Sequence, residues 1–286
     1  MPEQMNVLIT GCSSGIGYSL ARDFRQRRHR VFASARRPES LTELKAENFD
    51  IVALDVTDPA SIQHAVDEVL AAAGRIDMLI NNAGFGLFGP TIELPLPEIR
   101  RQFETNVVGA LALIQAVVPH MVKHGFGRIV NVTSVSAVLT TPFAGAYCAS
   151  KAAMQSFSEA LRMELAPLGV DVVAVQPGAI QSRFGDNAAS LTGQFGGPGS
   201  LYHPIAEFLI KRAQTSQENA TPTDEFSRTL VDLLTQPVPP RLIRLGEGST
   251  RFPLLKRLMP EGMLDRMLMK RFGLELLRAK LKEKAK

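Results

Sequence analysis

The stretch Leu8–Ala21, LITGCSSGIGYSLA, decides the fold of this chain. Three glycines, Gly11, Gly15 and Gly17, follow an apolar run and precede a helical pattern. Such a turn lets the backbone approach a pyrophosphate, and the start of the following helix favours negative charge. Glycine also tolerates left-handed backbone, so a tight turn without a ligand is the alternative. The stretch predicts a strand, a turn and a helix, and it leaves both interpretations of the turn open.

Short runs rich in Val and Ile alternate with helical patterns along the chain. Strands with little polar alternation are buried on both faces, which is typical of a parallel sheet between two layers of helices. Right-handed crossovers then predict an α/β, doubly wound parallel sheet (Rossmann fold), with ligands at the carboxyl ends of the strands. We expect strands near residues 6–10, 30–35, 49–56, 76–83, 127–134, 170–178 and 240–246. We expect helices near 14–27, 59–73, 97–123 and 146–166.

The chain divides into a single domain, residues 1–245, and a basic helical C-terminal extension, residues 246–286. Within the domain, residues 184–200 contain five glycines. We expect the segment 184–220 to form a mobile substrate lid, and a disordered insertion is the alternative. Residues 241–286 hold thirteen Lys or Arg and five Asp or Glu, a net charge of +8 that leaves −4 for the rest. The basic pI therefore belongs to the tail and does not indicate binding of nucleic acid.

The extension places Leu264, Leu268 and Phe272 in one row, with Met263 and Met267 beside it and basic residues in the gaps. One interpretation is an interfacial helix that makes peripheral contact with an anionic membrane. The other, which we favour, is that the row covers the substrate pocket or a subunit interface.

Two cysteines without a metal-binding or CxxC spacing are typical of a reduced, cytoplasmic protein. The N-terminus has no basic segment followed by a long apolar one, and no run of 18 apolar residues predicts a membrane span. We therefore expect a cytoplasmic protein, peripheral to the membrane if the extension binds lipid. The scattered histidines form no ligand cluster, so we expect no metal.

The strongest chemical signal lies between residues 134 and 151. Ser134 follows a predicted strand, and Tyr147 and Lys151 share one face of the next helix at i and i+4. A neighbouring ammonium stabilises a phenolate, so a tyrosine in this position can exchange a proton with an alcohol or carbonyl oxygen. Ser134 can hold the same oxygen. A tyrosine and a lysine at this spacing are common by chance in helices. Here the pair follows a serine at a strand end, in a chain with a glycine-rich turn, and this context favours a catalytic role.

Several motifs then occur in order: TGCSSGIG (Thr10–Gly17), NNAG (Asn81–Gly84), YCASK (Tyr147–Lys151) and PG (Pro177–Gly178). In this order, with Asp55, Asn106 and Ser134 between them, they resemble the compact form of the short-chain dehydrogenase/reductase family. The resemblance covers residue 5 to about residue 180.

The resemblance implies roles for four catalytic residues. Tyr147 is the general acid in reduction and the base in oxidation, and Ser134 polarises the substrate oxygen. Lys151 lowers the pKa of the tyrosine and bonds the nicotinamide ribose. Asn106 holds a water that relays protons to Lys151.

The resemblance also implies a cofactor site. Asp55 and Val56 bracket the adenine. Ser182 stands near the position where the family usually has a threonine that bonds the nicotinamide carboxamide. The full set of implied cofactor residues is Gly11, Ser13, Ser14, Gly15, Ile16, Gly17, Asp55, Val56, Asn82, Ala83, Gly84, Tyr147, Lys151, Pro177, Gly178, Ile180 and Ser182.

The end of the second strand distinguishes the two nicotinamide cofactors. An enzyme that uses NAD has an acidic residue there for the ribose 2′-hydroxyl. This chain has Ala35, followed by Arg36 and Arg37, and a guanidinium can pair with a 2′-phosphate. The arginines predict NADP(H), with a solvated turn as the alternative.

The substrate side is mostly apolar. We expect Leu139, Phe143 and Phe184 to line the pocket with Ser134 and Tyr147, which favours a hydrophobic carbonyl or secondary alcohol, such as a steroid, retinoid or lipid ketone. The resemblance is greatest to the branch with retinol, 17β-hydroxysteroid and acyl-dihydroxyacetone-phosphate reductases. No Arg or Lys is obviously placed to bind a carboxylate of the substrate, although Arg183 is a candidate for that role.

Three functions are compatible with these residues. The first is an NADP(H)-dependent oxidoreductase that assembles, as the family does, into a dimer or tetramer. The second is a non-catalytic NADP(H)-binding sensor or scaffold, although such proteins usually lack part of the tyrosine–lysine pair. The third is an epimerase or dehydratase of the extended relatives, which have a different glycine spacing.

Overall fold

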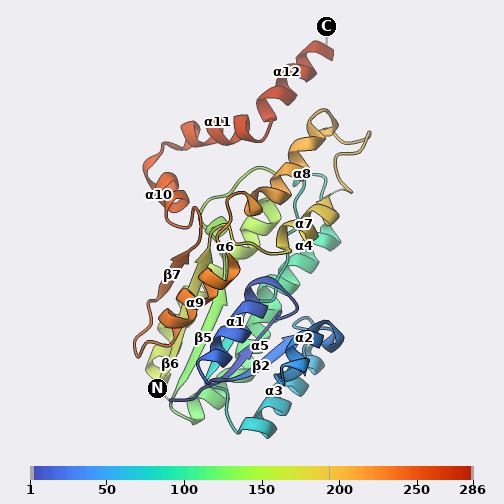
Figure 1. Cartoon of the computed structure of the whole chain (residues 1–286). Coiled ribbons are helices and arrows are strands. Elements are labelled where there is room, and N and C mark those ends of the chain that lie inside the picture. The colour runs from blue at the N-terminus through green and yellow to red at the C-terminus, as the bar shows by residue number, and fades with distance from the viewer. Residues whose placement is uncertain (1–2, 193, 285–286) are drawn as a thin grey trace.

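A parallel sheet forms the centre of the molecule (Figure 1). The computed structural model describes residues 3–192 and 194–284. In these residues seven strands have the order β3-β2-β1-β4-β5-β6-β7, and all neighbours are parallel. The strands are β1 Asn6–Ile9, β2 Arg30–Ala35, β3 Asp50–Ala53, β4 Met78–Asn81, β5 Gly127–Val132, β6 Val170–Pro177 and β7 Leu242–Leu245. The predicted doubly wound sheet is confirmed, with β7 at an edge. The order reverses between β1 and β4, where such sheets bind ligands.

Helices cover both faces of this sheet. They are α1 Gly15–Gln26, α2 Thr42–Ala46, α3 Pro59–Ala73, α4 Leu96–Phe103, α5 Gly109–Lys123, α6 Gly145–Leu165, α7 Phe184–Thr192, α8 Ala206–Gln214, α9 Thr223–Leu234, α10 Arg251–Leu258, α11 Glu261–Arg271 and α12 Leu274–Lys284. Successive residues of β1 point to opposite faces. Val7 and Ile9 therefore pack with α1 and α9, whereas Leu8 packs with α3, α5 and α6.

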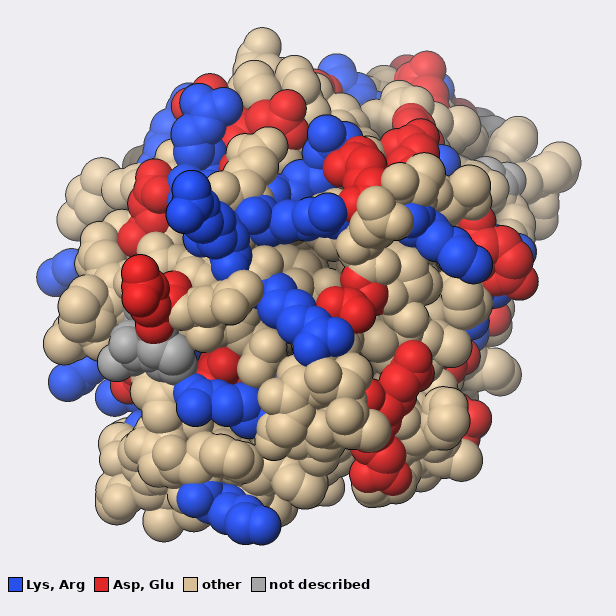
Figure 2. Space-filling model, turned by 60° about the horizontal axis from the view of Figure 1, so that its bottom comes forward, with Lys and Arg blue, Asp and Glu red and all other residues tan. Residues whose placement is uncertain are grey.

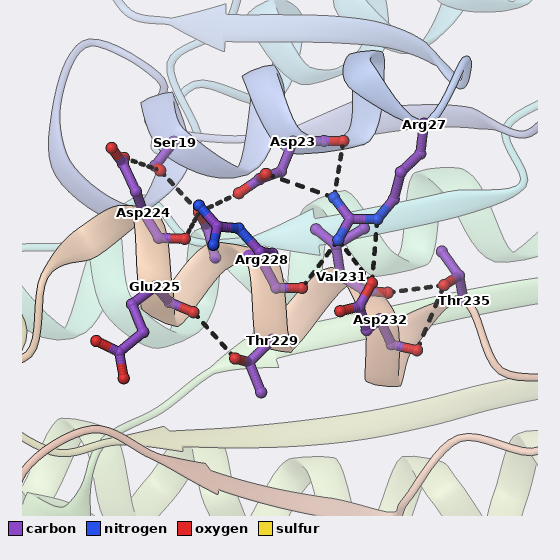
Figure 3. Close-up of polar contacts among 11 residues, drawn as sticks. Ser19, Asp23, Arg27, Asp224, Glu225, Arg228, Thr229, Val231, Asp232 and Thr235 are labelled. Carbon is purple, nitrogen blue, oxygen red and sulfur yellow. Dashed lines mark hydrogen bonds and ion pairs between the residues drawn. The ribbon is translucent and has the colours of Figure 1, made fainter.

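Polar contacts join α1 to α9 (Figure 3). The Ser19 hydroxyl donates to Asp224 Oδ1 at 2.9 Å, and it lies 2.7 Å from the Ser227 hydroxyl. At the far end of α1, Arg27 forms an ion pair with Asp232 at 2.6 Å. These contacts hold in place the helix whose first turn begins at the glycine-rich stretch.

The long helix expected over residues 97–123 is interrupted. Residues Glu104–Val108 form a π-helical turn between α4 and α5. Such turns occur often at functional sites, and this one contains Asn106. By length and composition, the combined helix Leu96–Lys123 could cross a membrane, and among the described residues it is the one that could. Leu113 and Val117 of this helix are fully buried in the core.

The segment 184–220 is more regular than predicted. Residues Phe184–Thr192 form α7 and residues Ala206–Gln214 form α8, so these parts of the predicted lid are helical. The mobile lid and its alternative, a disordered insertion, both stay predictions. Gly193 lies outside the described residues.

Helices α10 to α12 of the C-terminal extension run along the upper end of the molecule in Figure 1 (red), and α12 leads to the C-terminus. The predicted row Leu264, Leu268 and Phe272 is buried, and it packs with Ile205 and Leu209. Met263 beside the row is 50% exposed. The row therefore contacts the protein body.

Candidate active site

The glycine turn brings three parts of the backbone into close contact. Gly11 and Gly15 have φ values of +74° and +59°, which glycine adopts without strain. A Cβ on Gly11 would lie 2.9 Å from Ala83 Cα, and one on Gly17 would lie 2.4 Å from the Gly11 oxygen. A Cβ on Gly15 would lie 3.0 Å from Ser182 Cβ. The turn thus has the close approach that a pyrophosphate cradle requires.

Thr10 fixes the turn to the end of β4, a role that motif reading missed. Its buried hydroxyl oxygen accepts hydrogen bonds from the backbone amides of Asn82 and Ala83, both at 2.9 Å. The Asn82 side chain donates in return to the Thr10 and Gly11 carbonyls at 2.9 and 3.1 Å. The threonine at the start of TGCSSGIG is the sequence feature from which this role could have been predicted.

Ser134, Tyr147 and Lys151 come together at the carboxyl end of β5. All three are less than 9% exposed. The Ser134 hydroxyl oxygen accepts from the Ser136 amide at 3.0 Å, and Ser134 lowers the pKa of Tyr147. Lys151 Nζ donates to the Val132 carbonyl at 2.9 Å and lies 6.0 Å from the centre of the Tyr147 ring. The helical spacing of the tyrosine and lysine therefore places both beside the predicted serine.

Burial dominates the acid–base properties of the pair. It raises the pKa of Tyr147 to about 12, against the opposing effects of the Ser134 hydrogen bond and the Arg212 charge. Burial also lowers the pKa of Lys151 to about 8. The net shift of the tyrosine is thus opposite to the predicted lowering, because desolvation penalises the charged form of each group.

Asn106 is held from two sides in the π-helical turn. Its Oδ1 accepts from the Phe85 amide at 3.1 Å, and its Nδ2 donates to the Phe85 carbonyl at 3.0 Å and to the Ser150 hydroxyl at 3.1 Å. A Cβ on Gly84 would lie 3.0 Å from Asn106 Oδ1 and 3.6 Å from Lys151 Nζ. The asparagine is therefore next to the lysine, as predicted, and Ser150 is a partner that motif reading missed.

An aromatic wall covers the tyrosine. The rings of Phe88 and Phe184 lie 5.5 and 5.4 Å from the Tyr147 ring, so Phe184 is where the sequence placed it. Leu139 and Phe143 instead pack in the cluster beneath the C-terminal helices. Their predicted place in the lining of the substrate pocket stays a prediction. Phe143 has a φ of +63°, a rare conformation for an aromatic residue.

The other predicted cofactor residues surround the turn or its neighbouring strand ends. Arg36 and Arg37 are exposed after β2. Asp55 Oδ1 accepts from the Thr57 amide at 2.9 Å, and a Cβ on Gly178 would clash with the Glu247 carbonyl. Arg183, the predicted clamp candidate, donates to the Ser13 carbonyl at 3.2 Å.

The remaining predicted residues are Ser14, the N-cap of α1, together with Ile16, Val56, Pro177 and Ile180. In the described part of the chain, no three His, Cys, Asp or Glu could hold a metal ion.

Comparison with known proteins gives these residues a family. The chain is 37% identical to the 3-ketodihydrosphingosine reductase of Bacteroides thetaiotaomicron over 91% of its own length and 94% of the relative. A short-chain dehydrogenase from Streptomyces avermitilis has 30% identity and a TM-score of 0.76, with 99% of this chain and 97% of that one covered. A serine dehydrogenase solved with NADP+ has 28% identity and a TM-score of 0.72, with 86% and 96% covered.

The family model for short chain dehydrogenases matches residues 5–191, which include the glycine turn, Asn106, Ser134, Tyr147 and Lys151. This protein belongs to the short-chain dehydrogenase/reductase family of oxidoreductases.

Proposed function

We propose that the protein is an NADP(H)-dependent oxidoreductase that interconverts the carbonyl and secondary alcohol forms of a hydrophobic substrate. The observation that carries the proposal is the buried pair Ser134 and Tyr147 beside an aromatic wall. Two hydroxyls can hold one oxygen of the substrate, while apolar rings hold the carbon atoms around it. The reductase identified in Bacteroides thetaiotaomicron supports a lipid ketone as one example of the substrate class.

In this proposal the residues of the chain position and protonate the substrate oxygen. Ser134 holds the oxygen, and Tyr147 donates its proton to it during reduction or removes a proton during oxidation. When Lys151 is protonated, its charge stabilises the phenolate left after reduction. Asn106 and Ser150 keep the lysine side of the site ordered. NADP(H), when bound, supplies or accepts the hydride.

The glycine turn and the arginines after β2 support NADP(H) as the cofactor. Gly11, Gly15 and Gly17 leave room for a pyrophosphate at the start of α1, and the exposed Arg36 and Arg37 suit a 2′-phosphate. The NADP+ complex of the serine dehydrogenase supports the same assignment.

Turnover distinguishes this function from that of a sensor or scaffold. We expect the purified protein to consume NADPH with a panel of hydrophobic ketones and aldehydes. Tyr147→Phe should lower kcat/KM by about 10²- to 10⁴-fold, the usual contribution of a general acid. Tyr18→Phe is the matched control, because Tyr18 bonds Glu43 on the outer side of α1. Tight NADPH binding without turnover of any carbonyl would instead support the scaffold.

For the C-terminal extension, we propose a covering role at the substrate side. The burial of Leu264, Leu268 and Phe272 supports this role over an apolar face turned to lipid. Peripheral membrane contact through the remaining exposed residues, such as Leu254 and Leu258, stays a prediction.

The other partner predictions concern nucleic acid and a second copy of the chain. On the face in Figure 2, basic and acidic side chains are interspersed, which suits a protein that does not bind nucleic acid. Assembly into a dimer or tetramer is supported by exposed apolar residues on α4 and α6, such as Leu96, Phe157 and Met163.

A further inference from the structure

Arg212 is a buried arginine next to the proposed active site. It lies on α8 and is 7% exposed. Its Cζ is 4.7 Å from the centre of the Phe88 ring and 5.8 Å from that of Phe272, and its Nε donates to Thr141 Oγ1 at 2.9 Å. The guanidinium is thus held between the aromatic wall, the loop before α6 and the C-terminal helices.

This guanidinium forms no ion pair with any carboxylate in the described residues, and its bond to Thr141 uses one of five N–H donors. The charged neighbour on α11, Arg271, has the same sign, and pairs with Glu218 at 3.3 Å. Burial lowers the pKa of Arg212. A buried charge without a counter-ion is unfavourable, and an anion that enters the site would offset that cost.

Arg212 is one aromatic ring away from the reacting oxygen. Phe88 contacts the guanidinium on one side and the Tyr147 ring, at 5.5 Å, on the other. The arginine also acts electrostatically on Tyr147 and Cys148. Phe184, Ala188 and Ala213 belong to the same hydrophobic cluster as Phe88 and Tyr147. Among the described residues, the Phe88 ring is therefore all that the contacts place between the guanidinium and the Tyr147 ring.

We propose that Arg212 is the anion-recognition residue of the substrate site, and that the substrate is a hydrophobic carbonyl compound or alcohol with a carboxylate or phosphate near the reacting carbon. The planar guanidinium binds either group through paired hydrogen bonds. This inference rests on the proposed function and narrows its substrate class. It assigns to Arg212 the clamp role for which the sequence suggested Arg183, whose guanidinium instead bonds the glycine turn.

A matched substrate series tests the inference. The series has one apolar ketone, decan-4-one, with one of four groups at C1: a carboxylate, its methyl ester, a phosphate or a trimethylammonium group. With NADPH, wild type should prefer a charged anionic form over the ester by about tenfold or more in kcat/KM, and should turn over the trimethylammonium form least. The carboxylate and phosphate arms show which oxyanion is used.

Variants separate recognition from a structural role. Arg212→Gln should lower kcat/KM for the preferred anion by about tenfold or more, with the ester changed less than threefold. Arg212→Lys should keep part of the preference, because it keeps the charge. Arg278→Gln, an exposed arginine of α12, is the control and should keep all of it. An equal loss for anion and ester in Arg212→Gln, with the preference for the anion unchanged, would overturn the inference.

A binding measurement keeps this result separate from failure of the proposed function. Decanoate and decyl phosphate should raise the Tm of wild type in the presence of NADP+ more than decanol does. That difference should disappear in Arg212→Gln. If wild type reduces the ester but shows no anion effect in either assay, the inference is wrong and the proposed function stands. If no ketone turns over while the anions still bind through Arg212, the proposed function fails and the anion site stands.

Discussion

At the scale of single residues, the burial of Lys151 makes the folding stability of the protein depend on pH, whether or not a substrate is bound. It is buried beside Tyr147, it donates to the Val132 carbonyl, and burial lowers its pKa from 10.5 to about 8. Below pH 8 the folded protein must therefore hold a buried ammonium. Between pH 8 and pH 10.5 the unfolded chain binds more protons at this residue than the folded chain, so folding stability gained from this group rises with pH.

This effect predicts a difference between wild type and Lys151→Met. From pH 7 to pH 10, the free energy of unfolding of wild type should increase relative to the variant by about 2 kcal/mol. Tyr147 is present in both proteins, so its own titration largely cancels from the difference. The measurement is denaturant unfolding at several pH values. Parallel stability curves for the two proteins would show that the lysine does not titrate in this range.

The two arginines after β2 predict the choice of cofactor. Arg36→Ala combined with Arg37→Ala should lower the ratio of kcat/KM for NADPH over NADH by about tenfold or more, because a charge-assisted pair with the 2′-phosphate is lost. Arg100→Ala, on the exposed surface of α4, should leave the ratio unchanged. Equal use of NADPH and NADH by wild type would contradict the assignment.

Motif residues were predictable because each lies next to a strand end or on a known helix face. The i, i+4 spacing of Tyr147 and Lys151 and the placement of Ser134 after a strand required no tertiary information. Arg212 was not predictable, because its environment comes from Phe88, Thr141 and Phe272, which are far from it in the sequence. The net rise in the pKa of Tyr147 was missed for the same reason, since burial depends on the whole fold.

At the scale of elements, the hydrophobic pattern located the strands and four helical segments, which correspond to α1, α3, the pair α4 and α5, and α6. It missed α7, among others. Glycines around Phe184–Thr192 lower the helical propensity of the segment. In the folded chain, Thr192 Oγ1 donates to the Phe88 carbonyl at 3.2 Å, and Ala188 packs in the cluster with Tyr147. Tertiary contacts therefore favour a helix where the local sequence suggests a loop. The π-helical turn at Asn106 also has no signature in the hydrophobic pattern.

The row on α11 gives a prediction for stability. Leu264 is 2% exposed, whereas its neighbour Met263 is 50% exposed. Leu264→Ala should lower the free energy of unfolding by about 2–5 kcal/mol through lost burial and a cavity. Met263→Ala should change it by less than about 0.5 kcal/mol. Denaturant unfolding of both variants measures the difference. Equal effects would mean that the extension does not pack on α8 in solution.

At the scale of the whole molecule, the substrate side is built from segments distant in the chain. Helix α8, the loop before α6 and the C-terminal helices meet in one hydrophobic cluster that contains Leu139, Phe143, Ile205 and Leu209. This cluster adjoins the aromatic wall through Arg212. The extension thus forms part of the same body as the proposed active site, and a change in it should affect the substrate side more than the glycine turn.

Transfer of deuterium from 4,4-dideuterated NADPH to a hydrophobic ketone tests the central claim most directly. Mass spectrometry of the alcohol should find one deuterium on the former carbonyl carbon when wild type is the catalyst. With Tyr147→Phe, the same labelled product should form about 10²- to 10⁴-fold more slowly. An alcohol without deuterium, or equal rates for wild type and Tyr147→Phe, would contradict the account.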